Sequence, residues 1–302
     1  MGRIVVIGSS NTDMVVICKK MPSPGETVMG KEFFMVQGGK GANQAVAAAR
    51  AGGSVSFIAR VGDDDFGRNA VAGYKTDGIN ADHILIDQDM SSGIAVILVD
   101  EVTAQNSIVV ASGANGKLSI DDILSAEKII SEADEVLIQL EIPIEVVEFS
   151  LRLAKKYGVK TILNPAPAQS LTEEILSLVD IITPNESETE ILTGIYPGTE
   201  EEVKLAAATL LKKVNESVII TLGHKGVYFI AKNGENGFVP TVKVDAIDTT
   251  AAGDVFNGFL AAAISENKNF VEAISLANKA ATISVTKKGA QPSIPTLEEL
   301  SI

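Results

Sequence analysis

The stretch VQGGKGANQAVAAA, residues 36–49, joins three glycines and a lysine to an alanine-rich run. The alanines predict a helix that ends at Gly52 and Gly53, and a glycine loop at a helix start is typical of phosphate binding. The stretch fits neither common phosphate loop, because Gly41 stands where a Walker loop has Ser or Thr, and no glycine fingerprint follows the first strand. The glycines therefore indicate close backbone approach to another group, or simply a tight turn before a packed helix.

Outside this stretch, short apolar runs alternate with helical patterns. Such alternation predicts βαβ units, and hence an α/β fold with a central, mostly parallel sheet flanked by helices. The expected strands are 3–10, 54–62, 133–141, 159–167, 179–185, 216–223 and 226–234. The expected helices are 41–52, 65–78, 143–158, 186–194, 200–214, 251–266 and 269–289.

Two regions, about 12–36 and 89–112, contain strand patterns with no helix between them. Their residues alternate in character, as those of a half-exposed antiparallel sheet do. We expect these regions to form a small lid sheet inserted into a single domain that spans residues 1–302.

Composition limits the possible functions. The chain has 25 basic and 39 acidic residues, and its net charge of −14 disfavours nucleic acid and anionic membranes as partners. No apolar run reaches the roughly 18–20 residues of a membrane span, and the N-terminus reads as a core strand rather than a signal peptide. The single cysteine, Cys18, suits a reducing cytoplasm, and with only two histidines a His/Cys metal site is not expected.

A second stretch, DTTAAGDVFNG at 248–258, places small residues before a predicted helix. The free amides of Ala251, Ala252 and Gly253 would form an anion hole there. Asp254 could accept a proton from a hydroxyl while these amides hold a transferring phosphoryl group. The alternative is that Asp254 is only the N-cap of the helix.

Two further segments also allow two interpretations. TPNESE, residues 183–188, can be a capped helix start with Asn185 as the cap, or can place Glu188 near phosphates through a cation. TLGHKG, residues 221–226, can be a strand–turn–strand, or its glycines can let a ring or ribose approach closely.

GGKGANQA and DTTAAGDVFNG together resemble the two signatures of the ribokinase-like (PfkB) sugar kinase family. NTDMV, VASGANG, NPAPA, TPNESE, TLGHKG and KKGAQPSIP look like other family segments in family order, so the resemblance covers the whole chain. It implies phosphorylation of D-ribose to D-ribose 5-phosphate by ATP, with Mg²⁺ required and K⁺ as an activator. It also implies a cytoplasmic homodimer joined through the lid sheet, which would cover apolar lid residues.

The resemblance assigns roles to individual positions, which we give as sets. The sugar is assigned to Asn11, Asp13, Gly39, Lys40, Asn43 and Glu141. The general base is Asp254, and the anion hole is Ala251, Ala252 and Gly253. The nucleotide is assigned to Asn185, Glu188, Thr221, Gly223, Gly226 and Asn278. Potassium is assigned to the side chains of Asp248 and Ser293 and to the carbonyls of Thr250, Ser284, Lys287 and Gly289, an oxygen-only set that suits a hard cation.

Two alternatives remain. Another kinase of the same family would act on 2-deoxyribose, a ketohexose, a nucleoside or a phosphorylated fructose; ANQA and NTD favour ribose, and the lid offers few lysines for a phosphosugar. A non-catalytic sugar-binding regulator would lack the base or the anion hole, and both are present. One departure from the family pattern is Phe259 after Gly258, where a small residue is usual; we expect it to pack in the core.

Overall fold

The computed structural model describes residues 1–103 and 105–301. Its main feature is a nine-stranded sheet in the order β13-β12-β11-β10-β9-β8-β1-β4-β5. The strands are β1 (Arg3–Ile7), β4 (Ser54–Gly62), β5 (Ile84–Asp87), β8 (Glu135–Ile138), β9 (Lys160–Leu163), β10 (Ile181–Ile182), β11 (Ser217–Thr221), β12 (Val227–Ala231) and β13 (Asn236–Val239). All pairs from β5 to β11 are parallel, and only β11–β12 and β12–β13 are antiparallel. The predicted mostly parallel α/β fold is confirmed.

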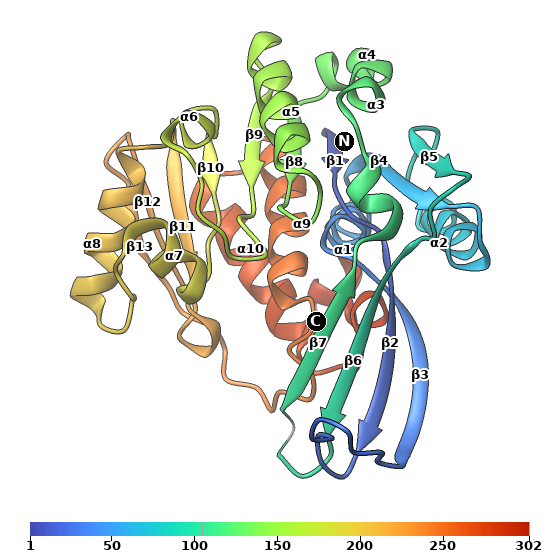
Figure 1. Cartoon of the computed structure of the whole chain (residues 1–302). Coiled ribbons are helices and arrows are strands. Elements are labelled where there is room, and N and C mark those ends of the chain that lie inside the picture. The colour runs from blue at the N-terminus through green and yellow to red at the C-terminus, as the bar shows by residue number, and fades with distance from the viewer. Residues whose placement is uncertain (104, 302) are drawn as a thin grey trace.

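Helices cover both faces of this sheet (Figure 1). One apolar core lies under α1 (Lys40–Arg50), α2 (Asp65–Thr76), α9 (Ala252–Ser265) and α10 (Phe270–Ser284). The other lies under α3 (Ile120–Ser125), α4 (Glu127–Ser131), α5 (Ile144–Lys156), α6 (Glu173–Leu176), α7 (Glu186–Thr193) and α8 (Glu200–Leu211). Alternate residues of a strand enter opposite cores, as Val6 and Ile7 of β1 do, because side chains in a strand alternate between faces.

Small residues bring α1 and α9 together closely. A Cβ atom on Gly258 would lie 2.5 Å from the Cβ of Ala47, so only glycine fits at this crossing. Phe259, the next residue, is fully buried, which confirms that it packs in the core. The close crossing sets the first turns of the two helices side by side, and the polar cluster described below forms there.

A second sheet of four strands, in the order β3-β2-β6-β7, projects from the main body (Figure 1). Its strands are β2 (Asn11–Cys18), β3 (Gly30–Gly38), β6 (Gly93–Asp100) and β7 (Asn106–Ala111). The hairpin pairs β2–β3 and β6–β7 are antiparallel, but β2 and β6 are parallel. The prediction of an antiparallel sheet is therefore wrong for the central pair. The chain returns to the main sheet between the two hairpins, and each hairpin then leaves that sheet in the same direction.

The remaining differences lie at short elements and helix ends. β5, β13, α3, α4 and α6 have no counterpart among the predicted elements. The helix predicted over 269–289 ends at Ser284, where the Ser284 and Thr286 hydroxyls donate to the carbonyls of Ala281 and Ile283 and compete with the helical pattern. Short 3₁₀ turns lie at Gly113–Lys117, Gly223–Lys225, Gln291–Ser293 and Glu298–Ser301. Across residues 1–103 and 105–301, no helix is both long and apolar enough to cross a membrane.

Candidate active site

The glycine loop before α1 packs against the chain that leaves β1. Gly39 has φ of 90°, and a Cβ there would lie 2.7 Å from the backbone nitrogen of Asn11. A Cβ on Gly41 would lie 2.5 Å from the nitrogen of Ser9. The close approach that these glycines permit is therefore to the protein's own backbone, and it brings the start of α1 beside the start of β2.

Four of the predicted sugar residues form a polar cluster with Asp254 around this contact, namely Asp13, Lys40, Asn43 and Glu141, and Asn11 lies beside them at the start of β2. The Lys40 amide donates to Glu141 Oε2 at 3.0 Å, and Asn43 Nδ2 donates to Asp254 Oδ2 at 2.9 Å. Asp13 faces both Glu141 and Asp254 electrostatically. The Oδ1 atom of Asn43 is buried and has no hydrogen-bond partner within the described part of the chain, so it can accept a bond from a hydroxyl group.

Burial and the neighbouring charges shift the pKa of Asp13, Asp254 and Lys40. Burial raises the pKa of Asp13 to about 7, with help from Glu141 and Asp254. Burial also raises the pKa of Asp254, against the effect of Lys40 and two amide donors. For Lys40, burial acts to lower the pKa, but the surrounding carboxylates outweigh it, so the net shift is upward and the ammonium stays charged. The site is thus an acidic pocket that a single cation partly neutralises.

The first turn of α9 decides between the two interpretations of Asp254. The N-cap position is Ala251, with φ of 61° and no side-chain capping bond, whereas the Asp254 carboxylate points at Asn43. The N-cap alternative is therefore wrong. Of the three predicted anion-hole amides, that of Ala252 donates to the Thr249 carbonyl at 3.3 Å, while Gly253 is exposed with open space beside its Cα.

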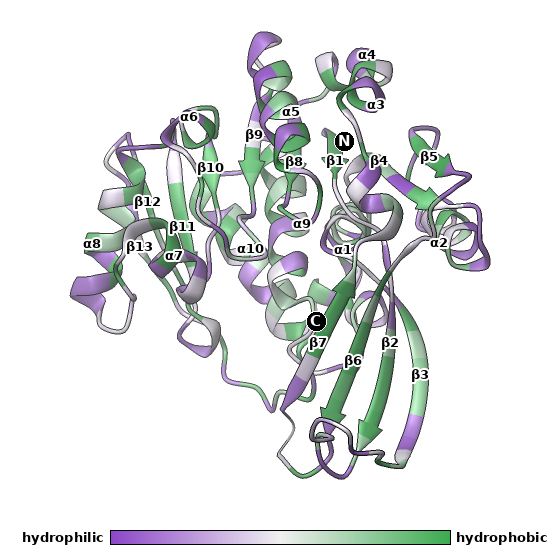
Figure 2. Cartoon of the chain, viewed as in Figure 1, coloured by the Kyte–Doolittle hydropathy of each residue, from purple (hydrophilic) through white to green (hydrophobic). Residues whose placement is uncertain are grey.

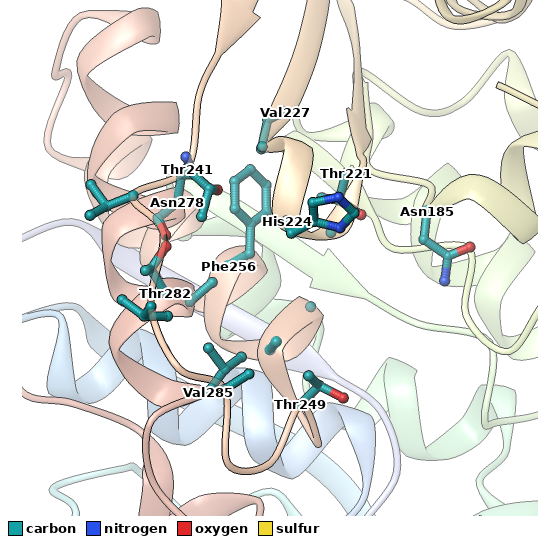
Figure 3. A pocket seen from close by; sticks show the side chains of 18 of the residues that line it. Asn185, Thr221, His224, Val227, Thr241, Thr249, Phe256, Asn278, Thr282 and Val285 are labelled. Carbon is teal, nitrogen blue, oxygen red and sulfur yellow. Dashed lines mark hydrogen bonds between the residues drawn. The ribbon is translucent and has the colours of Figure 1, made fainter. Parts of the chain in front are cut away.

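A cavity of about 720 Å³ opens on the other side of the α9 start (Figure 3). Five of the six predicted nucleotide residues line it, namely Asn185, Thr221, Gly223, Gly226 and Asn278. Ala252 and Gly253 also line it, and Val227, Phe256 and Val285 give it apolar walls. The cavity therefore ends one residue from Asp254, and only the first turn of α9 separates it from the polar cluster.

The sixth residue, Glu188, does not line this cavity. Its carboxylate accepts from the backbone nitrogen of Asn185 at 2.9 Å, and the Asn185 side chain accepts from the Glu188 nitrogen at 2.9 Å. This is a capping box at the start of α7, the alternative that the spacing allowed. Burial raises the pKa of Glu188, and the Asn185 amide and Lys40 oppose that shift.

The predicted potassium residues are partly brought together. Asp248 Oδ1 accepts from the nitrogen and the hydroxyl of Thr250, and its Oδ2 accepts from the Gly289 nitrogen at 2.9 Å. The Ser284 carbonyl accepts from the Lys287 nitrogen at 3.0 Å, and the Val285 carbonyl accepts from the Asp248 nitrogen at 3.2 Å. Ser293 is buried, and its hydroxyl donates to the Ala290 carbonyl instead of to any of these residues.

Four buried polar residues of the site have no predicted role. Gln44, Gln139 and Asn164 form a chain of amides behind Asp254, and Asn115 Nδ2 donates to Asn11 Oδ1 at 2.7 Å. A sequence signal exists for two of them, because Gln139 and Asn164 directly follow apolar strands whose carboxyl ends share one sheet edge. Gln44 stands among alanines in a buried helix, which is also unusual for a polar side chain.

Comparison with known proteins identifies the family of the chain. The family model for pfkB family carbohydrate kinases matches residues 1–297. A ribokinase from Haemophilus influenzae is 48% identical over 297 residues, which cover 98% of this chain and 96% of the relative. A deoxyribokinase from Salmonella typhimurium is 37% identical over 299 residues, covering 99% and 97%. The structure of Arabidopsis thaliana ribokinase complexed with ribose and ATP has a TM-score of 0.91 and 32% identity, covering 100% and 98%.

The family match and these relatives show that the chain is a carbohydrate kinase, a class of phosphotransferase. The chain belongs to the pfkB family of carbohydrate kinases.

Proposed function

We propose that this chain transfers the γ-phosphoryl group of ATP to the 5-hydroxyl of D-ribose. The observation that carries the proposal is the buried Asp254 carboxylate, which faces the polar cluster while the preceding residue, Gly253, lines the cavity. The identity to the Haemophilus ribokinase over nearly the whole chain supports ribose as the sugar.

In this mechanism the sugar binds in the cluster of Asn11, Asp13, Lys40, Asn43 and Glu141, whose donors and acceptors match a set of hydroxyls. Asp254 accepts the proton of the 5-hydroxyl as that oxygen bonds to the γ-phosphorus. The bond between the γ-phosphorus and the bridging oxygen breaks, and ADP leaves with the electron pair. The amide of Gly253, at the positive end of α9, stabilises charge on the transferring group.

ATP would lie in the cavity, with its base against the apolar walls near Val227 and Val285. Mg²⁺ would supply charge neutralisation on the phosphates. Glu188 is already engaged in its capping box, so we assign it to contact through water at most. K⁺ would be held by the oxygens of the Asp248 and Gly289 loops, which a hydrogen bond already joins.

The test is a coupled assay of ADP release with Mg-ATP across ribose, 2-deoxyribose, fructose, fructose 6-phosphate and adenosine, each with K⁺ or Na⁺. We expect ribose to give the highest kcat/KM and K⁺ to raise it. Turnover only on another sugar would overturn ribose as the substrate. Equal rates in K⁺ and Na⁺ would overturn the cation assignment alone.

A second candidate is 2-deoxyribose, favoured by the 37% identity to the Salmonella deoxyribokinase over the same length. The two sugars differ only at the 2-hydroxyl. A site built to bind that hydroxyl would reject the deoxy sugar strongly, because its own buried partners would be left unpaired. The ratio of kcat/KM for the two sugars therefore decides between the candidates.

We also propose a homodimer joined through the small sheet, in the cytoplasm. The strands of this sheet are largely hydrophobic although the sheet projects from the body (Figure 2). Phe33, Met35, Ile108, Val109 and Val110 are 48–69% exposed. An exposed apolar surface of this kind is typical of an interface. The same sheet would close over the sugar and exclude water from the transferring phosphoryl group.

A further inference from the structure

Behind the Asp254 carboxylate lies a chain of buried amides. Gln44 Nε2 donates to Asp254 Oδ1 at 2.9 Å and to Asn164 Oδ1 at 3.0 Å. The Oε1 atom of Gln44 accepts from Gln139 Nε2 at 2.7 Å. Gln44 thus uses both of its N–H groups and its oxygen, and with no exposed surface it cannot contact the sugar directly.

A backbone carbonyl group fixes the orientation of these side-chain amides. A side-chain amide can rotate by 180° and exchange its oxygen with its NH₂ group. Asn164 Nδ2 donates to the Thr183 carbonyl at 3.2 Å, and a carbonyl can only accept. Asn164 must therefore turn its oxygen to Gln44, and Gln44 must turn its NH₂ group to Asn164 and to Asp254. Reversing either amide would bring two acceptors or two donors together in a buried place.

We propose that Gln44 is a positioning residue that holds Asp254 in the ionised state and in the direction required of the base. The inference rests on the proposed function, in which Asp254 takes the proton of the sugar. Gln44 binds one carboxylate oxygen and Asn43 binds the other, so rotation of the carboxylate would break both bonds. Two amide donors favour the charged form of the carboxylate over the protonated form.

Other charged groups also face Asp254, and the test must separate them from Gln44. Lys40 of α1 favours the ionised carboxylate, whereas Glu141 after β8, Asp13 of β2 and Glu188 of α7 oppose it. Gln44 is uncharged, like Asn43, so replacing it changes the hydrogen bonding of Asp254 without changing the number of charges.

The variant is Gln44→Met, which keeps the length of the side chain and removes both donors. We expect the acidic limb of the pH profile of kcat/KM to move up by about one pH unit. At a pH well down the acidic limb we expect a rate about tenfold lower than that of the native protein at the same pH, with little change in KM for ATP. Gln139→Leu leaves the Gln44 donors in place but removes the group that donates to Gln44 Oε1. We expect it to shift the acidic limb in the same direction, by a smaller amount.

Thr161→Val is the matched control for a purely structural effect. Thr161 is fully buried at the opposite end of β9, where its hydroxyl donates to the Leu178 carbonyl. The Thr161→Val variant should have a lower melting temperature and an unchanged acidic limb of the pH profile. If both Gln44→Met and Gln139→Leu lower the melting temperature and leave the limb in place, Gln44 is only structural and the inference is wrong.

A second readout does not need turnover. In protein labelled with ¹³C at aspartate carboxyls, the Asp254 signal is the one missing from Asp254→Asn. Its pKa should rise in Gln44→Met, or in Gln139→Leu if Gln44→Met does not fold. An unchanged pKa overturns the inference even for an active enzyme. A raised pKa in a protein that phosphorylates no sugar supports the inference and overturns only the proposed function.

Discussion

Asp254 lies in the first turn of a helix, yet its side chain turns inward rather than capping the helix. Burial makes this carboxylate a stronger proton acceptor than an exposed one, while Lys40 and two amides keep its charged form accessible. Side chains of α1 therefore favour the ionised form of Asp254, and the first glycine loop is the segment that leads into α1.

Asp254→Asn tests the base directly. The substitution keeps the size of the side chain and removes the proton acceptor, so kcat should fall by at least ~100-fold. ATP affinity, measured by calorimetry, should stay close to that of the native protein because the cavity is unchanged. Near-normal turnover would show that another group takes the proton.

Asn43→Ala removes the unpartnered Oδ1 atom that we assign to a sugar hydroxyl. We expect KM for ribose to rise by roughly tenfold, since a lost hydrogen bond to a buried partner costs about 1–3 kcal/mol, and KM for ATP to change little. Asn278→Ala, in the wall of the cavity, is the reciprocal control and should raise KM for ATP instead. An equal rise in both constants for either variant would indicate general damage to the fold.

Asp13 makes stability depend on pH. The folded protein keeps this proton up to about pH 7, whereas an unperturbed carboxyl releases it near 3.8. Between these values the folded state binds more protons, so the free energy of unfolding falls as pH rises. Asp13→Asn removes this loss and should stabilise the apoprotein, by at most about 4 kcal/mol above pH 7 and by little near pH 4.

Denaturant unfolding at pH 4.5 and pH 8 measures this effect. Asp82→Asn, at an exposed carboxylate, is the control and should change stability equally little at both values. A gain for Asp13→Asn that is the same at both pH values would contradict the assigned shift.

At the scale of elements, strand register divides the small sheet into two faces. Asn11 and Asp13 share one face of β2, whereas Met14 lies on the other, beside Met35 of β3 and Val96 of β6. Val109 of β7 continues this row. The face away from the proposed sugar residues thus carries a row of apolar side chains across all four strands, exposed at Met35, Val96 and Val109 and half-buried at Met14.

Val109→Glu tests whether this row is the dimer contact. The side chain is 69% exposed in the single chain, so the variant should fold normally but place two carboxylates in the interface. Light scattering should report the mass of one 31.6 kDa chain for the variant and a dimer for the native protein. Leu205→Glu, also exposed but on α8, should remain a dimer. A native protein that is monomeric at micromolar concentration would contradict the dimer.

At the scale of the whole molecule, the net charge of −14 opposes the approach of ATP. Salt screens this repulsion, so the association rate of Mg-ATP should rise about two- to fivefold as tetramethylammonium chloride increases from about 20 to 200 mM at constant K⁺. Ribose, which is uncharged, serves as the control in the same stopped-flow experiment. A slower association of Mg-ATP with salt would mean that local positive charge at the cavity dominates.

The alternation of apolar runs was enough to predict the parallel sheet, because buried strands and amphipathic helices differ in the spacing of apolar residues along the sequence. The direction of the β2–β6 pair was not predictable, since it depends on where the chain goes between the hairpins. Asp254 was a candidate base from its place after the small residues of the second stretch, and the roles of Asp254 and Asn43 were predicted through the family resemblance. Gln44, Gln139 and Asn164 were not, because their role arises from a hydrogen-bonded chain that joins three elements and has no local pattern.

Strand β2 carries the proposed sugar residues on one face and part of the apolar row on the other, and the two sets alternate along the same few residues. Inserting or deleting one residue here would turn Asp13 outward and Met14 toward the sugar, and so damage both surfaces at once. Over residues 11–14 the strand can therefore change length only by pairs of residues. The register shift between Ile17 and Cys18 lies beyond both sets, and it marks the position where a single extra residue could be absorbed without harm.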